Sequence, residues 1–257
     1  MTLNYQQGGQ GQPVILLHGL FGSLENLNGI KRALETDYRV VNLDLPDHGR
    51  SPASSHFSYA RYAQQVLETL DGLQLDQVAL LGHSMGGKVA MQLALDHPDR
   101  VVKLLVADIA PVPYPKRHGE VFAGLNNVNL AALDGRQSAD RQLAEHIHEP
   151  GVRQFLLKSL QKDEERWQWR FNLPLLQAEY DKITGWPDSD RQFKGPTLFI
   201  KGGNSDYITA QQRDAIVRQF PNSQGHIIAD AGHWLHAEKP AAFNKIARDF
   251  IAADGTG

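Results

Sequence analysis

The 257-residue chain carries 26 basic and 29 acidic residues, which give a formal net charge of −3, and it contains no cysteine. Because charges of both signs are mixed along the chain, no basic field indicates nucleic-acid binding and no polybasic run indicates anionic lipid. The lack of cysteine excludes disulfides, thiolate metal sites and cysteine nucleophiles. No basic and apolar leader opens the sequence, and no apolar segment approaches the roughly 18 residues of a membrane span. We therefore expect a soluble, cytoplasmic protein that acts on a small molecule and holds no metal.

Short apolar runs bounded by Gly, Pro and Asp alternate with amphipathic stretches over most of the chain. This alternation is typical of an α/β fold with a mainly parallel central sheet and helices on both faces. Right-handed crossovers would bring the carboxyl ends of the parallel strands to one edge, where ligands bind. In chain order, the predicted strands are Pro13 to Leu17, Arg39 to Leu43, Val78 to Leu81, Val102 to Ala107, Pro196 to Lys201 and His226 to Ala229. The predicted helices are Leu27 to Leu34, Tyr59 to Leu73, Met85 to Leu95, Ala210 to Gln219 and Ala241 to Ala252.

Residues 111 to 190 interrupt this alternation. They open with a proline-rich run and continue with helix-like stretches. The chain is long enough for one catalytic domain with an insertion, so we expect residues 1–110 and 191–257 to form an α/β core and residues 111–190 to form a helical lid between two core strands. Most aromatic residues of the insertion should pack its own small core. A few, Trp186 among them, should line a substrate pocket beneath the lid.

The run Gly82 to Gly87, Gly-His-Ser-Met-Gly-Gly, lies between the third predicted strand and the helix that follows it. A G-x-S-x-G turn changes a strand into a helix so sharply that the serine is strained, its oxygen is exposed, and only small neighbours fit around it. The start of the helix also presents free backbone N–H groups and the positive end of its dipole. Ser84 is therefore the predicted nucleophile, and the Met85 N–H is a predicted oxyanion donor. The loop Leu16 to Gly22 is expected to supply the second donor, the Leu20 N–H.

A serine hydroxyl needs a general base within hydrogen-bond reach and an oriented acid behind that base. Among the eleven histidines, His233 is best placed, because it follows the last predicted strand and precedes the last helix. His236 is the nearest alternative and would lie about one turn further on, and His83, beside the nucleophile, should have a structural role. The histidines expected to face solvent are His97, His118, His146 and His148.

Two aspartates follow core strands at positions that suit the acid. Asp108 follows the fourth predicted strand and Asp206 follows the fifth. Either one preserves the chain order Ser, Asp, His. The structural alternatives are a carboxylate that caps the entry of the lid for Asp108, and a turn residue or helix N-cap for Asp206. From the residues alone, either aspartate could be the acid that orients the base.

Together with the His18-Gly19 turn and the run Asp44 to Ser51, the sequences around Ser84 and His233 resemble the α/β-hydrolase superfamily over nearly the whole chain. The resemblance implies an α/β-hydrolase fold. Several segments are similar more specifically to the small bacterial YbfF-type esterases, which implies hydrolysis of esters and acyl-CoA thioesters without a cofactor. These segments are His18 to Ser23, Gly82 to Lys88, Asp108 to Pro111, Gly202 to Ser205, Gly232 to Trp234 and His236 to Pro240.

The resemblance also bears on the acid. In most of the superfamily the acid follows the strand before Asp206, whereas in the YbfF-like subgroup it lies in an Asp-Ile-Ala-Pro element, which here begins at Asp108. This chain carries an aspartate at both places. The resemblance therefore favours Asp108, with Asp206 as the alternative, and it suggests that Ser205 hydrogen-bonds near His233.

We therefore expect a cofactor-free serine esterase or thioesterase in which Ser84 attacks a carbonyl, His233 moves the proton and Asp108 orients the imidazole. We also expect Phe21, with Trp186 and Trp234, to contact the substrate. The same residues could serve perhydrolysis or carbon–carbon bond hydrolysis, because fold and triad do not determine the acyl group. A non-catalytic ligand receptor is the remaining alternative, although a pure binding pocket does not need a nucleophile and base. The sequence does not indicate the acyl chain length or the oligomeric state.

Overall fold

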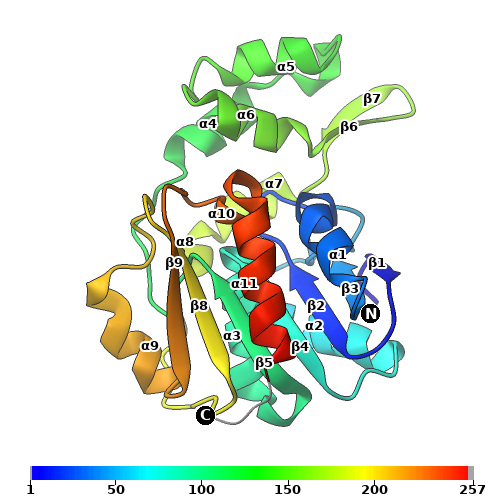
Figure 1. The fold of residues 1–257 in the computed structure, drawn as a ribbon. Coiled ribbons are helices and arrows are strands. Elements are labelled where there is room, and N and C mark those ends of the chain that lie inside the picture. The colour runs from blue at the N-terminus through cyan, green and yellow to red at the C-terminus, as the bar shows by residue number, and fades with distance from the viewer. Residues whose placement is uncertain (1, 254–257) are drawn as a thin grey trace.

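The computed structural model describes residues 2 to 253 and has a seven-stranded sheet at its centre, with helices on both faces (Figure 1). The strand order is β1-β3-β2-β4-β5-β8-β9. β1 pairs antiparallel with β3, and every other neighbouring pair is parallel, which confirms the predicted mainly parallel α/β fold. The strands are β1 (Tyr5–Gly8), β2 (Pro13–Leu17), β3 (Arg39–Leu43), β4 (Val78–His83), β5 (Val101–Ala107), β8 (Thr197–Gly202) and β9 (Ser223–Ile228).

Each face of the sheet carries a buried apolar layer. Successive side chains of a strand point to opposite faces, so in β2 Val14 and Leu16 pack in the layer of α1 and α11, whereas Ile15 and Leu17 pack in the layer of α2 and α3. The strands are apolar at successive positions because both of their faces are covered. The helices that flank the sheet are α1 (Asn28–Leu34), α2 (Tyr59–Gly72), α3 (Met85–Asp96), α9 (Arg213–Gln219), α10 (Leu235–Glu238) and α11 (Pro240–Ala252).

The predicted core strands and helices are all present, with ends displaced by a few residues. One further strand, β1, was not predicted, because its sequence Tyr-Gln-Gln-Gly has no apolar alternation and lies at the edge of the sheet. The predicted helix from Ala210 to Gln219 begins instead with one 3-10 turn, Ala210–Gln212, and continues as α9.

The segment between β5 and β8 stands over the carboxyl ends of the strands, with α4, α5, α6 and a hairpin at the top of the molecule (Figure 1). The insertion is largely helical, as expected. The hairpin β6–β7 was not predicted, because its two strands, Leu-Gln-Lys-Asp and Arg-Trp-Gln-Trp, are mostly polar. Within the described part of the chain, no helix has the length and apolar character needed to cross a bilayer. The elements of the insertion are α4 (Gly119–Asn127), α5 (Arg136–Leu143), α6 (Pro150–Leu157), β6 (Leu160–Asp163), β7 (Arg166–Trp169), α7 (Leu173–Ala178) and α8 (Tyr180–Thr184).

Lys88, near the start of α3, connects the core to the last part of the insertion. Its side chain is 2% exposed, and its Nζ donates to the carbonyls of Thr184 at 3.0 Å and Gly185 at 2.7 Å. The Nζ also lies 5.0 Å from the ring centroid of Tyr114 and 5.6 Å from that of Tyr59. Burial lowers the pKa of Lys88 from its usual 10.5 to about 7. The amine is thus a buried titratable group that contacts both the core and the insertion.

Replacing Lys88 by Met should change how stability depends on pH. Between pH 7 and pH 10 the unfolded chain keeps a proton at Lys88 that the native protein has released, since the native pKa is about 7. The free energy of unfolding of the wild type should therefore rise, relative to that of Lys88→Met, as the pH increases through this window. The slope approaches about 1.4 kcal/mol per pH unit.

Urea unfolding of both proteins at pH 7, 8 and 9 measures this difference. Lys245→Met is the matched control, because the Lys245 side chain is 75% exposed on α11. The free energy of unfolding of Lys245→Met should change with pH as that of the wild type does. If the free energy of unfolding of Lys88→Met also changed with pH as that of the wild type does, the lowered pKa of Lys88 would be contradicted.

Candidate active site

Ser84 occupies the sharp turn between β4 and α3. Its backbone has φ 54° and ψ −122°, in the positive-φ region that non-glycine residues rarely adopt. The turn is closed so tightly that a Cβ atom on Gly82 would lie 2.3 Å from the carbonyl oxygen of Gly86. A Cβ on Gly86 would in turn lie 2.3 Å from the carbonyl oxygen of Leu17 at the end of β2. Only glycine fits at both positions, and the resulting turn presents the Ser84 hydroxyl at the edge of the sheet.

Gly86→Ala should destabilise the protein, because the added methyl group would overlap backbone atoms of β2 that cannot move away independently. Overpacking of this kind costs about 1 to 3 kcal/mol. Chemical denaturation measures the loss, with Gly29→Ala as the control. Gly29 is also on a helix, but nothing lies within 4 Å of a Cβ there, so alanine should be neutral or stabilising. Equal stability of the two variants would show that the turn relaxes freely.

Three side chains from different loops form one chain of hydrogen bonds. The Nε2 of His233 lies 3.0 Å from Ser84 Oγ, and its Nδ1 lies 2.7 Å from Asp108 Oδ2. His233 is in the loop between β9 and α10, and Asp108 directly follows β5. Because the carboxylate is an acceptor, the ring proton of a neutral His233 belongs on Nδ1. Nε2 is then free to accept the proton of the serine.

The Asp108 carboxylate is completely buried and receives three hydrogen bonds. Besides His233 Nδ1, the donors are the Gly202 N–H at 3.0 Å and the hydroxyl of Ser205. The contact of Ser205 with Asp108, and through it with His233, agrees with the expectation that Ser205 lies near the histidine. Hydrogen bonds of this kind stabilise the ionised form of a carboxylate. They also hold it at one orientation toward His233.

Asp206 lies four residues after the end of β8, in the loop that also carries Ser205, but it has a different environment. Its side chain is 73% exposed and pairs with Arg117 at 2.6 Å. The Arg117 guanidinium lowers the pKa of the Asp206 carboxyl through this hydrogen bond. Of the two predicted acids, the structure therefore brings Asp108 into contact with His233 and places Asp206 on the surface.

Tyr207, next to Asp206, was not predicted to be part of the site. Its ring is stacked on the His233 imidazole with centroids 4.0 Å apart and planes at 19°. The Arg117 guanidinium lies 4.7 Å from the Tyr207 centroid. The stacking contact limits the directions in which the His233 ring can tilt. In the sequence, the one indication of this contact is an aromatic residue on the loop that carries a candidate acid.

The two predicted oxyanion donors border the same pocket as Ser84. Met85 is the first residue of α3, so its N–H has no acceptor within the helix. Leu20 follows β2 in the loop that faces the turn at Ser84. In the described part of the chain, neither N–H donates to another residue. Both remain available to an oxygen atom that develops negative charge near Ser84.

Two buried histidines hold this loop in place. His18 Nε2 accepts the N–H of Leu45 at 3.0 Å, which leaves its proton on Nδ1, 2.8 Å from the carbonyl of Gly19. His48 Nε2 accepts the N–H of Phe21 at 3.2 Å. Burial lowers the pKa of both rings, to about 3 for His48. Both therefore act as neutral hydrogen-bonding groups that shape this loop.

The remaining histidines near Ser84 have distinct environments. His83 is buried and its Nε2 contacts the carbonyl of His233 at 2.7 Å, which agrees with a structural role. His236, the alternative base, is buried with its ring 4.5 Å from that of His83, and makes no contact with Ser84. The expectation that His118 faces solvent was wrong. His118 precedes α4 and is half-buried in the wall of the pocket.

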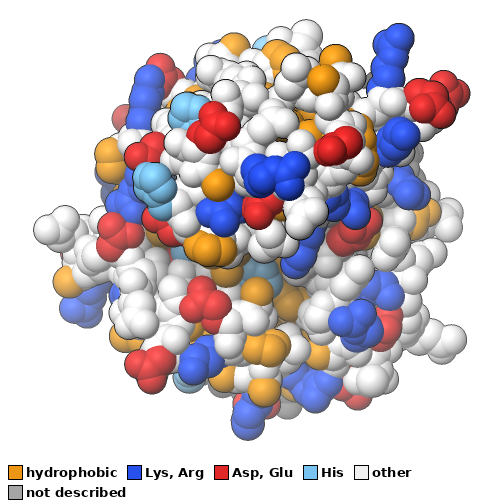
Figure 2. Space-filling model, turned by 90° about the horizontal axis from the view of Figure 1, so that it is seen from above, with side chains coloured by type: hydrophobic (Ala, Val, Ile, Leu, Met, Phe, Trp, Pro, Cys, Tyr) orange, Lys and Arg blue, Asp and Glu red, His pale blue; other side chains and the backbone are white. Residues whose placement is uncertain are grey.

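The pocket that contains Ser84 and His233 has a volume of about 720 Å³ and lies between the core and the insertion. Seen from above, the surface is hollowed near its middle, with hydrophobic and histidine side chains within the hollow (Figure 2). Phe21 and Trp234, which were expected to contact the substrate, line this pocket. Trp186 does not. Its ring packs 5.8 Å from that of Tyr59, and its indole N–H donates to Gln219 at 2.9 Å.

Comparisons with known proteins agree with this geometry. The model of the alpha/beta hydrolase fold family matches residues 12–240. The chain is 44% identical to Esterase YbfF of Escherichia coli over 93% of this chain and 92% of that protein. It is 40% identical to the mouse sn-1-specific diacylglycerol lipase ABHD11, over 93% of this chain and 80% of the lipase. Among solved structures, a marine microorganism esterase has a TM-score of 0.94 and 35% identity, covering 97% of this chain and 99% of its own.

Proposed function

The chain belongs to the α/β-hydrolase family and is a serine ester hydrolase, and on this premise we propose that it hydrolyses carboxylic esters and acyl thioesters through an acyl-enzyme on Ser84. One observation carries the proposal: the hydrogen-bond chain from Ser84 through His233 to Asp108 opens into an apolar pocket. The arrangement supplies a nucleophile, a base with a free ring nitrogen and a buried acid. No step of the proposed reaction requires a cofactor.

In the first half of the reaction, Ser84 Oγ attacks the carbonyl carbon while His233 Nε2 takes the hydroxyl proton. The N–H groups of Leu20 and Met85 would stabilise the oxyanion of the tetrahedral intermediate, and the positive end of the α3 dipole adds to this stabilisation. His233 then gives its proton to the departing alcohol or thiol. Asp108 stabilises the imidazolium that exists between these steps.

In the second half, water takes the place of the leaving group. His233 Nε2 removes a proton from the water, whose oxygen attacks the acyl-enzyme carbonyl, and the same ring returns the proton to Ser84 Oγ as the carboxylic acid leaves. The same base therefore serves both halves.

We also propose that residues 111–190 act as a lid that shapes the acyl pocket. The pocket wall combines core residues such as Leu20 and Ile109 with residues of the insertion such as Val121, Phe155 and Leu156. Apolar side chains from both parts would surround the acyl chain and exclude water from the acyl-enzyme. Backbone hydrogen bonds attach the insertion to the core at residues 170–172, where the Asn172 N–H donates to the Asp47 carbonyl at 2.8 Å and the Gly49 N–H donates to the Arg170 carbonyl at 2.6 Å.

Ser84→Ala should abolish turnover of both p-nitrophenyl esters and acyl-CoA thioesters, since one nucleophile serves both. A fluorophosphonate probe should label the wild-type protein at Ser84 and leave Ser84→Ala unlabelled, as read by mass spectrometry of the digested protein. Ser205→Ala is the labelling control, because this second serine of the site has its hydroxyl turned to Asp108. The assignment of Ser84 fails if the alanine variant keeps full esterase activity. Turnover of esters without thioesters would restrict the proposal to esters.

Asp108→Asn should lower kcat by about 10⁴-fold, because an amide at this position favours the wrong tautomer of the base. Asp206→Asn should change kcat by less than about threefold, since Asp206 is exposed and its amide can still accept from Arg117. Steady-state kinetics on p-nitrophenyl acetate compares the two. A reversed order of the two variants would assign the acid to Asp206.

A further inference from the structure

His118 is a half-buried histidine in the pocket wall that the proposed reaction does not use. It immediately precedes α4, and its ring meets that of Phe21 edge to face at a centroid distance of 6.1 Å. On another side it meets the ring of Tyr180, from α8, at 5.6 Å. The contacts with Phe21, from the loop after β2, and with Tyr180, from the insertion, hold the imidazole at the boundary of core and lid.

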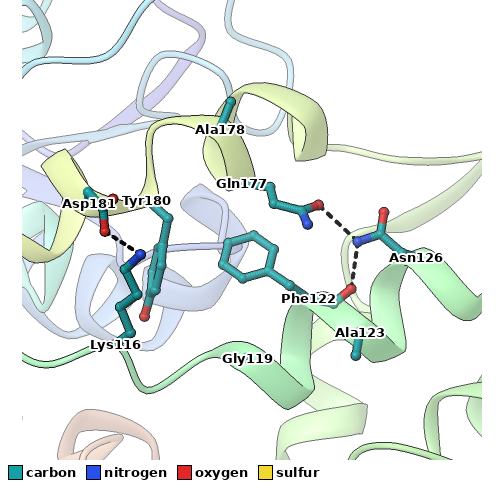
Figure 3. A pocket seen from close by; sticks show the side chains of 9 residues that line it. All are labelled: Lys116, Gly119, Phe122, Ala123, Asn126, Gln177, Ala178, Tyr180 and Asp181. Atoms are coloured by element: carbon teal, nitrogen blue, oxygen red, sulfur yellow. Dashed lines mark hydrogen bonds and ion pairs between the residues drawn. The ribbon is translucent and has the colours of Figure 1, made fainter.

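The hydroxyl of Tyr180 determines which nitrogen of His118 carries the proton. This oxygen accepts the backbone N–H groups of Arg117 and of His118, each at 3.2 Å. Its third partner is His118 Nδ1. With two N–H groups already pointing at the oxygen, the phenol proton is left for Nδ1, and no other acceptor for it occurs in the described part of the chain. Figure 3 shows the Tyr180 hydroxyl directed at the segment between Lys116 and Gly119.

If Nδ1 accepts, the proton of a neutral imidazole must be on Nε2. Burial lowers the pKa of His118 to about 4, and the neighbouring His233 and Arg117 act in the same direction, so the ring is neutral at neutral pH. Nε2 hydrogen-bonds to none of the described residues and is not sealed from solvent. His118, one of the residues that line the pocket, therefore carries an N–H donor without an acceptor of its own.

We infer that His118 Nε2–H binds an oxygen atom in the alcohol part of the substrate and so determines specificity. This inference rests on the proposed function. The alcohol part begins at the oxygen that His233 protonates, and His118 and His233 line the same pocket. Apolar residues such as Phe155 and Leu156 line other parts of the same pocket. The favoured substrates are esters of glycol-like or glycerol-like alcohols, which carry a second oxygen near the scissile bond.

Two isosteric esters test the inference. 2-Methoxyethyl butyrate and butyl butyrate differ only in an ether oxygen, which accepts hydrogen bonds and does not donate. For the wild type, the ratio of kcat/KM values for the ether ester over the alkyl ester should exceed the ratio of their alkaline hydrolysis rates. One hydrogen bond of ordinary net strength corresponds to a factor of about 3 to 10. A wild-type ratio no higher than the alkaline ratio would overturn the inference without any variant.

Two substitutions of His118 distinguish the role of its Nδ1 from that of its Nε2. His118→Asn places an amide near the Nδ1 position, where it can accept from Tyr180, but supplies nothing at Nε2. His118→Gln extends an amide donor to the Nε2 position. The ratio should fall about 3- to 10-fold in the asparagine variant and be largely kept in the glutamine variant.

Equal losses on both esters in His118→Asn would show a structural role for His118 and overturn the inference, as would an unchanged ratio. Failure of the proposed function is distinguishable, because the wild type would then hydrolyse neither butyrate ester. Thermal unfolding of both variants confirms that the rates refer to folded protein.

Discussion

The close approach of α3 to the end of β2 is the constraint on which the rest of the site depends. Gly86 lies so near the carbonyl of Leu17 that no side chain fits between them, and Ser84 consequently adopts a backbone conformation of positive φ. That conformation turns the hydroxyl away from the sheet and toward His233. It also brings the first N–H of α3 and the loop after β2 to the same side of Ser84. The local strain is maintained because the strands and helix on either side are buried.

Around this turn, neutral histidines act as hydrogen-bonding connectors. His18 and His48 attach the loop that carries Leu20 to the segment after β3, and His83 attaches the turn to the backbone of His233. Desolvation lowers the pKa of each of these rings. A neutral imidazole can accept at one nitrogen and donate at the other, and His18 and His48 each satisfy two backbone groups in this way. The ring of the proposed base lies 4.9 Å from that of His83, and among the histidines that the structure describes it is the one that contacts both a serine hydroxyl and a carboxylate.

The insertion completes the pocket and connects to this network at the level of single side chains. Lys88 binds the carbonyls at the end of α8, and Tyr180 at the start of the same short helix sets the tautomer of His118. A shift of α8 would therefore change both the attachment of the insertion and the donor that faces the substrate. The same contacts therefore determine both how the insertion is attached to the core and which donor the pocket offers to the substrate.

The sequence by itself determined the features that arise from local pattern: the parallel α/β core, the turn at Ser84, His233 as the proposed base, and the interruption of the core by residues 111–190. Apolar runs and a G-x-S-x-G turn can be predicted from the sequence because they depend only on residues that are neighbours in the chain. The resemblance favoured Asp108, but only the tertiary structure decided which aspartate meets His233, because both follow adjacent strands in the required chain order and burial is what separates them. It likewise placed Trp186 against Tyr59 and outside the pocket, and brought His118 and Tyr207 to the site. These contacts join residues far apart in the chain, so no local pattern specifies them.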